Sequence, residues 1–441
     1  MPTIKARIEI WRERGLVKAG LAVCAMYLAF ASAFTLLTPA WENNDERDHV
    51  KYIEYVDEHG TPPRIALENG IESHQPPLYY YLEAGWQRLL GLGTFAVDSP
   101  PPSPTLFSPT GPPWALSHDY TPRQRSQAFW VHDLRLVSLL CGLAAVLAGL
   151  ATGWLLTGRL RFAIGVAATV ALWPKFLVVT SAITNTALVD ALCACAVPTF
   201  LAWERTRSGA WAVTTGLLLG AAALTQETAL PIVGALLVLF VVCAWRSLDW
   251  RAPLLVLGSF LAISAWWYVR NDVLYGDPLA SHKAETYLSQ LPNVFGPLVR
   301  EPPSLSLDVL QSSVKTLGHS TWYDAGFNQI QLPHTLNLVL FVVAGICIAA
   351  ALGSRMSGWL PLAACAVASL IGWLLIIRVT TQGEGRYLLV AIVPWSALLV
   401  AGASHLTRNL PWNVGFLLWP GIMFGLDAYV IATWLIPSGG L

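Results

Sequence analysis

Apolar runs of about 20 residues recur along almost the whole chain, and they restrict its fold more than any other feature. A helix of that length crosses the ~30 Å hydrocarbon layer of a bilayer. Backbone in that layer has no water to bond, so a helix that satisfies its own peptide groups is the expected structure. Only 12% of the 441 residues are charged, which is well below the usual share in soluble domains. The sequence therefore predicts an all-α, polytopic membrane protein.

We expect eleven transmembrane helices from these runs. They cover approximately residues 16–38, 133–157, 161–181, 184–203, 209–225, 228–245, 252–270, 335–353, 358–377, 386–404 and 412–435. The first run is too long for the core of a signal peptide and lacks an Ala-x-Ala cleavage site, so we expect it to be retained.

The arginines test this number of spans. Each short link after an even-numbered span carries one or two of them: Arg159 and Arg161, Arg205 and Arg207, Arg246 and Arg251, Arg355, and Arg408. Together with the basic N-terminus they fall on one side, which the positive-inside rule makes cytoplasmic. We therefore expect a protein of the inner (plasma) membrane, with a cytoplasmic N-terminus and with its large loops and C-terminus outside.

This topology divides the chain into five parts. They are the N-terminus with the first span (1–38), a first outer loop (39–132), spans two to seven (133–270), a second outer loop (271–334) and spans eight to eleven (335–441). The first outer loop contains an amphipathic stretch, 77–92, that we expect as an interfacial helix, followed by a Pro-rich insert, 99–113. We expect interfacial helices in the second outer loop as well, because it is similarly aromatic and polar.

Charge and cysteine content exclude some functions. The net charge is zero and no basic tract is present, so we expect no nucleic-acid partner. All seven cysteines lie in apolar runs, where they are typical of small buried side chains, and we expect no disulfide.

The most polar stretch, 41–82, directly follows the first span. On a short helix Asp45 and His49 would share a face, and with Glu46 they could act as a general base or bind a divalent cation. The alternative is a capped helix with acids in its first turn. We favour no metal cofactor. Further on, prolines make the segment that carries Glu72 and His74 rigid; the alternative there is a loop with polar side chains in water.

Other polar residues lie at the outer ends of later spans. Lys175 and Asn185 belong to spans three and four, and a lysine at membrane depth needs a partner or an anionic ligand unless it reaches the surface. Arg270, at the end of span seven, is either an interfacial anchor or a phosphate contact. Glu384, Arg386 and Tyr387 open span ten, where the positive end of the helix dipole and Arg386 would act together on a phosphate. All these candidates are predicted to share the outer face, as group transfer from a phosphate-linked donor requires.

The sequence resembles the GT-C superfamily of integral-membrane glycosyltransferases, in particular the dolichyl-phosphate-mannose protein mannosyltransferase clan and its bacterial relatives. Five pieces carry the resemblance: NDERDHVKYI, ESHQPPLYYYL, the stretch from Pro174 to Asn185, WWYVRNDVLYGDPL and GEGRYLLVAIVP. The family departs from this chain at Thr186, where it often has aspartate, and at Gln226, where it often has lysine.

The resemblance implies a GT-C-like bundle that transfers a sugar from a polyprenyl-phosphate donor, with inversion, on the outer face. By position it makes Asp45 the acidic residue that acts as base or positions the acceptor, with Glu46 as substitute, and matches His74 and Arg386 to the family's motifs. Partners would be membrane lipid, the polyprenyl-phosphate sugar, a glycan, lipid or protein acceptor, and a membrane-protein partner. Our candidate substrate-binding residues are His49, Glu72, His74, Lys175, Asn185, Arg270, Glu384, Arg386 and Tyr387. The alternatives are a non-catalytic subunit or scaffold of a membrane assembly, or a lipid or sugar transporter.

Overall fold

The computed structural model describes residues 14–43, 45–92, 122–247, 249–288, 306–325, 330–354, 358–378, 383–410 and 414–436. The predicted Pro-rich insert at 99–113, the basic stretch before residue 14 and Arg355 lie outside these ranges.

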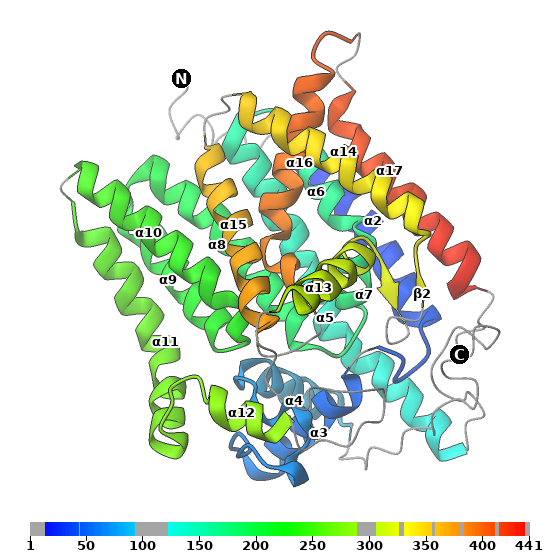
Figure 1. Ribbon diagram of the computed structural model, residues 1–441, viewed down its shortest axis with the longest axis vertical. Helices are drawn as coiled ribbons and strands as arrows, with labels where there is room; N and C mark the ends of the chain where they lie inside the picture. Colours follow the sequence, from blue (N-terminus) through cyan, green and yellow to red (C-terminus); the bar gives the residue numbers. More distant parts are fainter. Residues whose placement is uncertain are drawn as a thin grey trace.

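A bundle of long helices makes up most of the molecule (Figure 1). Within the described ranges, nine helices are long and apolar enough to cross a membrane. They are α2 (Arg14–Leu37), α5 (Pro122–Thr157), α8 (Asn185–Thr206), α10 (Leu230–Ser247) with η3 (Glu227–Ala229), α11 (Arg251–Tyr275), α14 (His334–Gly353), α15 (Trp359–Ile376), α16 (Ile392–Leu406) with η4 (Gly385–Ala391), and α17 (Gly415–Val430) with η5 (Ile431–Leu435). The prediction of an all-α, multi-pass membrane protein is confirmed.

Two of the eleven predicted spans differ from simple transmembrane helices. The third consists of α6 (Leu160–Ala171) and α7 (Pro174–Thr180), which meet at 60°. Pro174 accounts for the break, because proline lacks a donor and keeps the residue before it out of the helical conformation. The fifth is α9 (Gly209–Ala223), whose 15 residues are fewer than a perpendicular crossing needs. The part of the chain that the structure describes thus has nine such spans, or ten with the bent pair.

The remaining elements belong to the two predicted outer loops. The first contains α3 (Glu46–His59), η1 (Leu67–Asn69), η2 (Ile71–His74) and α4 (Leu78–Leu90), and the second contains α12 (Ser281–Leu288), α13 (Leu307–Ser320), β1 (Asp324–Ala325) and β2 (Ile330–Gln331). The helices α3, α4 and α12 gather at one end of the bundle (Figure 1). The amphipathic stretch predicted at 77–92 is α4: it buries Tyr79 and Tyr80 and exposes Leu89. The rings of Tyr52 and Tyr80 stack 3.6 Å apart and join α3 to α4.

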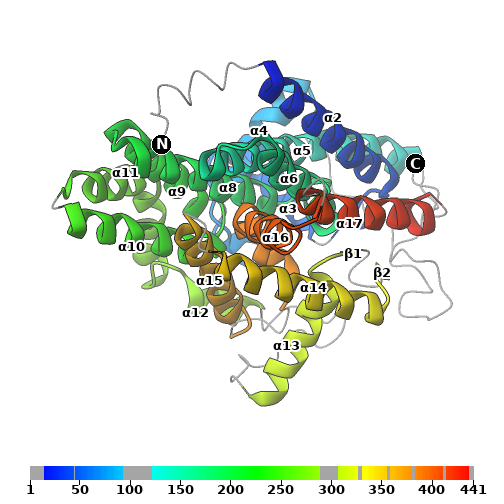
Figure 2. The same cartoon turned by 90° about the horizontal axis from the view of Figure 1, so that it is seen from above.

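Helix α16 lies at the centre of the bundle, among α6, α14, α15 and α17 (Figure 2). A Cβ atom on Gly402 would lie 1.7 Å from the carbonyl oxygen of Cys347, so α16 and α14 approach too closely for any larger residue. Small residues permit such contacts between membrane helices, where packing rather than water exclusion drives association.

The segment just before α16 is held equally closely. A Cβ atom on Gly385 would lie 2.4 Å from the Cα of Thr321, and the Gly385 amide donates a hydrogen bond of 2.7 Å to the Ser320 hydroxyl. This contact fixes the start of η4 against the end of α13. It therefore fixes the position of the next residue, Arg386.

Candidate active site

The loop between α2 and α3 has an unusual backbone. Trp41 and Asp45 adopt left-handed conformations, with φ of 71° and 66°, although neither is glycine. Such conformations cost about 1–3 kcal/mol and persist only where the surrounding structure imposes them. Asp45 is the residue before α3, and its carbonyl oxygen accepts the amide of His49 at 3.0 Å. The strained backbone and the helix start together determine where the Asp45 side chain points.

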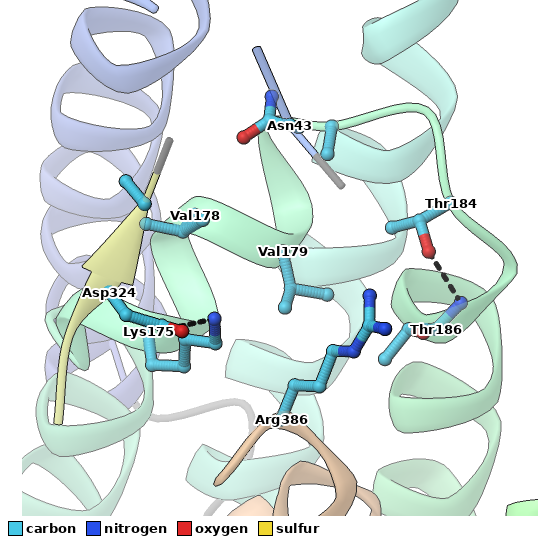
Figure 3. A pocket seen from close by; sticks show the side chains of 10 residues that line it. Asn43, Lys175, Val178, Val179, Thr184, Thr186, Asp324 and Arg386 are labelled. Carbon is cyan, nitrogen blue, oxygen red and sulfur yellow. Dashed lines mark hydrogen bonds and ion pairs between the residues drawn. The ribbon is translucent and has the colours of Figure 1, made fainter. Parts of the chain in front are cut away.

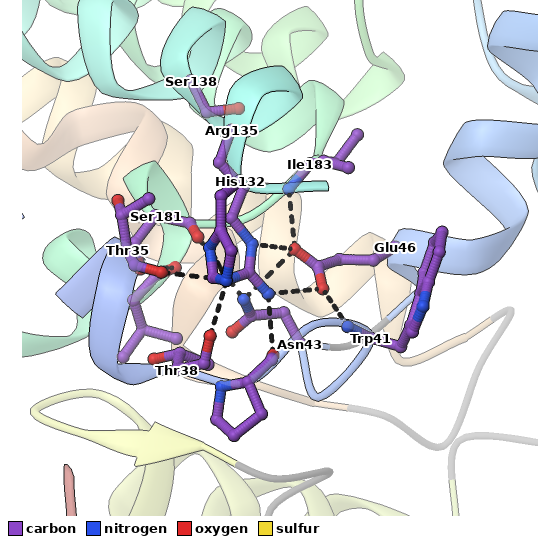
Figure 4. A network of polar contacts seen from close by, with 12 residues as sticks. Thr35, Thr38, Trp41, Asn43, Glu46, His132, Arg135, Ser138, Ser181 and Ile183 are labelled. Carbon is purple, nitrogen blue, oxygen red and sulfur yellow. Dashed lines mark hydrogen bonds and ion pairs between the residues drawn. The ribbon is translucent and has the colours of Figure 1, made fainter. Parts of the chain in front are cut away.

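A buried ion pair holds this loop (Figure 4). The Arg135 guanidinium, on α5, donates two hydrogen bonds of 2.8 Å to the Glu46 carboxylate, and both side chains are 0% exposed. Arg135 also donates to three carbonyl oxygens at the end of α2, namely those of Thr35, Thr38 and Pro39. The last carbonyls of a helix have no partner within it, so this arginine supplies one.

Glu46 accepts further bonds from the amides of Trp41 and Ile183 and from the Asn43 side chain. Its two oxygens therefore have five donors. The carboxylate joins the first outer loop to α5 and to the connection between α7 and α8. We predicted Glu46 as a substitute for Asp45 in catalysis, but the structure places it within this buried network and not on the wall of the cavity described below.

Asp45 has a different partner: it contacts Arg386, 341 residues further along the chain, at 3.3 Å. The Arg386 side chain also pairs with Glu384 at 3.0 Å, and its guanidinium lies 5.3 Å from the ring centre of Tyr387. The Asp45 side chain is 35% exposed and that of Arg386 is 12% exposed, so this ion pair is accessible to solvent. Asp45, Glu384, Arg386 and Tyr387, four of the predicted site residues, are thus brought together.

A small cavity lies beside Arg386 (Figure 3). Its volume is about 30 Å³, and it is lined by Asn43, Lys175, Val178, Val179, Ala182, Thr184, Thr186, Asp324, Ala325 and Arg386. The Lys175 ammonium, at the start of α7, forms an ion pair with the Asp324 carboxylate on β1. The sequence indicated that Lys175 needs a partner, and the structure gives it Asp324, an acid of the predicted second outer loop. Two cations, Lys175 and Arg386, line one cavity.

Two more candidates, His49 and Glu72, are buried. The ring Nδ1 of His49 is 3.0 Å from the Tyr80 hydroxyl, and burial, with help from Arg386, lowers the pKa of His49 to about 3. Burial raises the pKa of Glu72 well above its usual value, and the negative charges of Asp45 and Asp48 add to this. His49 is therefore neutral, and the environment of Glu72 disfavours the negative charge of its carboxylate.

Asn185 and His74 are linked through Gln75 by a chain of hydrogen bonds. The Asn185 amide donates to the Gln75 side-chain oxygen at 3.2 Å, and the Gln75 amide lies 3.1 Å from Nε2 of His74. Nδ1 of His74 is 2.8 Å from the Ile71 carbonyl, which can only accept, so Nδ1 carries the proton and Nε2 accepts from Gln75. Burial lowers the pKa of His74, which agrees with a neutral ring. Both ring nitrogens already have partners.

Arg270 lies elsewhere. Its guanidinium donates to the carbonyls of Pro62 and Pro63 at 3.3 and 2.9 Å and lies over the ring of Trp267. It connects α11 to the first outer loop, and it does not line the cavity around Lys175 and Arg386. Of the two alternatives left open by the sequence, this geometry corresponds to the anchor.

Sequence reasoning missed two residues of this region, Asp324 and Arg135. Asp324 lies in a short, ordinary-looking segment of the second outer loop, and only its folded position pairs it with Lys175. A signal for Arg135 existed, because a charge near the start of a membrane helix needs a partner. Within the described residues, no group of three or more His, Cys, Asp or Glu side chains is placed to hold a metal ion.

Comparison with known proteins gives structural matches only. No protein-family model matches the chain, and no curated protein matches it in sequence. The archaeal oligosaccharyltransferase AglB from Archaeoglobus fulgidus, solved with an inhibitory peptide and a dolichol-phosphate, aligns over 97% of this chain and 56% of its own, at 16% identity and a TM-score of 0.53. The same enzyme in complex with Zn and sulfate aligns over 94% and 53%, at 15% identity and a TM-score of 0.53.

This chain has the GT-C fold. It spans about half the length of the AglB structures. ArnT from Cupriavidus metallidurans bound to undecaprenyl phosphate also aligns, over 97% of this chain and 74% of its own, at 16% identity and a TM-score of 0.47. The GT-C architecture suggested by the sequence motifs is confirmed as a fold; these identities say nothing about donor or acceptor.

Proposed function

We propose that this protein is an inverting membrane glycosyltransferase that takes its sugar from a polyprenyl-phosphate donor on the outer face of the inner membrane. The observation that carries the proposal is the contact of 3.3 Å between Asp45 and Arg386, beside a cavity that Lys175 also lines. Inverting transfer needs a base for the acceptor and cations for the leaving phosphate, and this region supplies both chemistries. The dolichol-phosphate bound to AglB, a protein of the same fold, supports a lipid-phosphate ligand.

In the proposed reaction the Asp45 carboxylate takes the proton of an acceptor hydroxyl. The acceptor oxygen then attacks the anomeric carbon, while the bond from that carbon to the phosphate oxygen breaks and its electron pair leaves with the polyprenyl phosphate. Arg386 and Lys175 stabilise the negative charge of the leaving phosphate. A base typically contributes 10²–10⁴-fold, and preorganised charge contributes at least as much.

In this proposal the other candidate residues hold the segments around Asp45 in place. Glu46 and Arg135 fix the loop that presents Asp45, and the chain from Asn185 to His74 holds the segment behind it. The cavity of about 30 Å³ has room for no more than one or two water molecules, so a phosphate enters only after the surrounding side chains separate. The ion pair of Arg386 with Asp45 is the accessible one.

The test is transfer by the purified protein. We would incubate it with a panel of radiolabelled polyprenyl-phosphate sugars and membrane extract as acceptor, and follow the label into product and the release of polyprenyl phosphate. We expect turnover with at least one donor, and its loss in the Arg386→Ala variant. An Arg88→Ala variant, changed on the exposed face of α4, is the matched control. Absence of both turnover and donor binding across the panel would favour the scaffold or transporter alternatives.

A further inference from the structure

Among the described residues around the cavity, the paired acids outnumber the paired bases. Lys175 and Arg386 are its two cations, and three carboxylates contact them: Asp324 on Lys175, and Asp45 and Glu384 on Arg386. When all five groups are ionised, these described residues together carry one more negative than positive charge. A donor phosphate would add another, so it would be repelled by a region that contains the very cations meant to bind it.

Entry of a further anion therefore requires that the site gain a positive charge. Placing unbalanced negative charge in a poorly solvated region is costly, and buried acids usually respond by taking up a proton. Asp324 is placed to do so. Its side chain is 0% exposed, it lies on the cavity wall, and its Oδ2 atom has no hydrogen-bond partner among the described residues. Asp45, in contrast, is partly solvated and must stay ionised to act as a base.

We propose that Asp324 takes up one proton from solvent as the polyprenyl-phosphate donor binds, and so releases the Lys175 ammonium to the incoming phosphate. This inference rests on the proposed function and adds to it a residue and a proton count. The only bond made is the O–H bond on Asp324. The proton returns to solvent when the polyprenyl phosphate leaves and Lys175 pairs with Asp324 again.

The surroundings of Asp324 agree with this role. Burial raises the pKa of Asp324 to about 6; Lys175 and Arg386 oppose the rise and Glu384 adds to it. These are the charged groups that face it from α7 and from the start of η4. Tyr323 precedes it, and Asp427 of α17 is near that tyrosine. Bringing a phosphate to Lys175 weakens the main opposing influence and raises the pKa of Asp324 further.

The sign of the pH dependence follows. Below pH about 6 Asp324 already carries its proton in the free protein, so donor affinity is at its maximum. Above that pH every bound donor must bring one proton with it, and the affinity falls by about tenfold per pH unit until the pKa of the loaded state is reached.

Calorimetry with a diester probe tests this directly. A polyprenyl methyl phosphate keeps one negative charge from roughly pH 5 to 8, so the ligand itself does not titrate. Titrations of the purified protein in two buffers of different ionisation enthalpy count the protons taken up. We expect about one proton per ligand at neutral pH and above. The Asp324→Asn variant should bind tightly, independently of pH and without proton uptake. Asp308→Asn, an exposed acid of the same outer segment, should behave as the wild type.

Two results would overturn the inference and leave the proposed function standing: binding of the probe that is independent of pH with no proton uptake, or binding that requires added Mg²⁺ and again takes up no proton. No binding of the probe at any pH would instead count against the proposed function itself. If Asp324→Asn does not fold, the proton count of the wild-type protein still decides.

Discussion

Asp45 and Glu46 are adjacent acids, and each pairs with an arginine far away in the sequence, yet the two pairs differ in almost every physical respect. The pair of Glu46 with Arg135 is bidentate at 2.8 Å and 0% exposed on both sides. The pair of Asp45 with Arg386 has one contact at 3.3 Å, and its side chains are 35% and 12% exposed. The first pair lies in the protein interior, whereas the second is partly exposed and places Arg386 on the cavity wall.

The difference shows how a single turn can serve two purposes. A fully desolvated, fully hydrogen-bonded pair has no better partner available, so it fixes the loop. A partly solvated pair with one long contact can exchange its partners for a ligand at little cost. The buried pair of Glu46 thus holds the backbone beside Asp45 in a fixed position, one residue from the accessible pair. The following predictions test this division.

The largest effect is expected from Arg135→Met. Methionine fills similar space but leaves the Glu46 carboxylate and three carbonyls at the end of α2 without their donor. Breaking a buried pair in this way costs about 3–5 kcal/mol. We expect a clear fall in the melting temperature and in the yield of monodisperse protein in detergent. A melting temperature equal to that of the wild type would show that this pair does not hold the loop.

A smaller effect, on binding and not on folding, is expected from Arg386→Ala. Loss of one charge-assisted contact to phosphate costs about 1.5–3 kcal/mol, which is roughly a ten- to hundredfold weaker affinity for a polyprenyl phosphate. Fluorescence titration with a labelled polyprenyl phosphate measures it, with the melting temperature as a parallel readout. Unchanged affinity would remove Arg386 from the phosphate site.

The smallest effect is expected from Arg88→Met. Arg88 pairs with Asp57 between α4 and α3, but its side chain is 63% exposed. Such surface pairs contribute about 0–1 kcal/mol. Its melting temperature and donor affinity should both match the wild type, which gives the reference for the two variants above. A loss as large as that of Arg135→Met would mean that the junction of α3 and α4 matters more than the buried pair.

Much of the architecture follows from the sequence alone. The length of the apolar runs predicted the membrane helices, and the ten-residue motif around Asp45 and the late motif around Arg386 indicated the fold. Residues 161–181 were predicted as one span, so the break at Pro174 between α6 and α7 was missed. The meeting of Asp45 with Arg386 was predicted only as a shared face, because a topology places residues on a side of the membrane and not at a distance from one another.

The rest depended on tertiary packing. Nothing local in the sequence distinguishes Asp45 from Glu46. Glu46 is the buried one because Arg135 of α5 and the backbone amides of Trp41 and Ile183 lie around its carboxylate. Asp324 and Lys175 are 149 residues apart, and their pairing depends on how β1 rests against α7. The sequence left Arg270 as either a phosphate contact or an anchor, because its contacts with the carbonyls of Pro62 and Pro63 depend on the folded structure.

The most direct test of the account is transfer by Asp45→Asn, which keeps the size and polarity of the side chain but removes the base. We predict a loss of transfer of about 10²–10⁴-fold. The melting temperature should stay close to that of the wild type, because this partly exposed pair contributes little to stability. The affinity for polyprenyl phosphate should not fall, because the variant keeps Arg386 and removes a negative charge beside it. Full transfer activity in this variant, measured with the same radiolabelled donor, would contradict the assignment of Asp45 and with it the proposed mechanism.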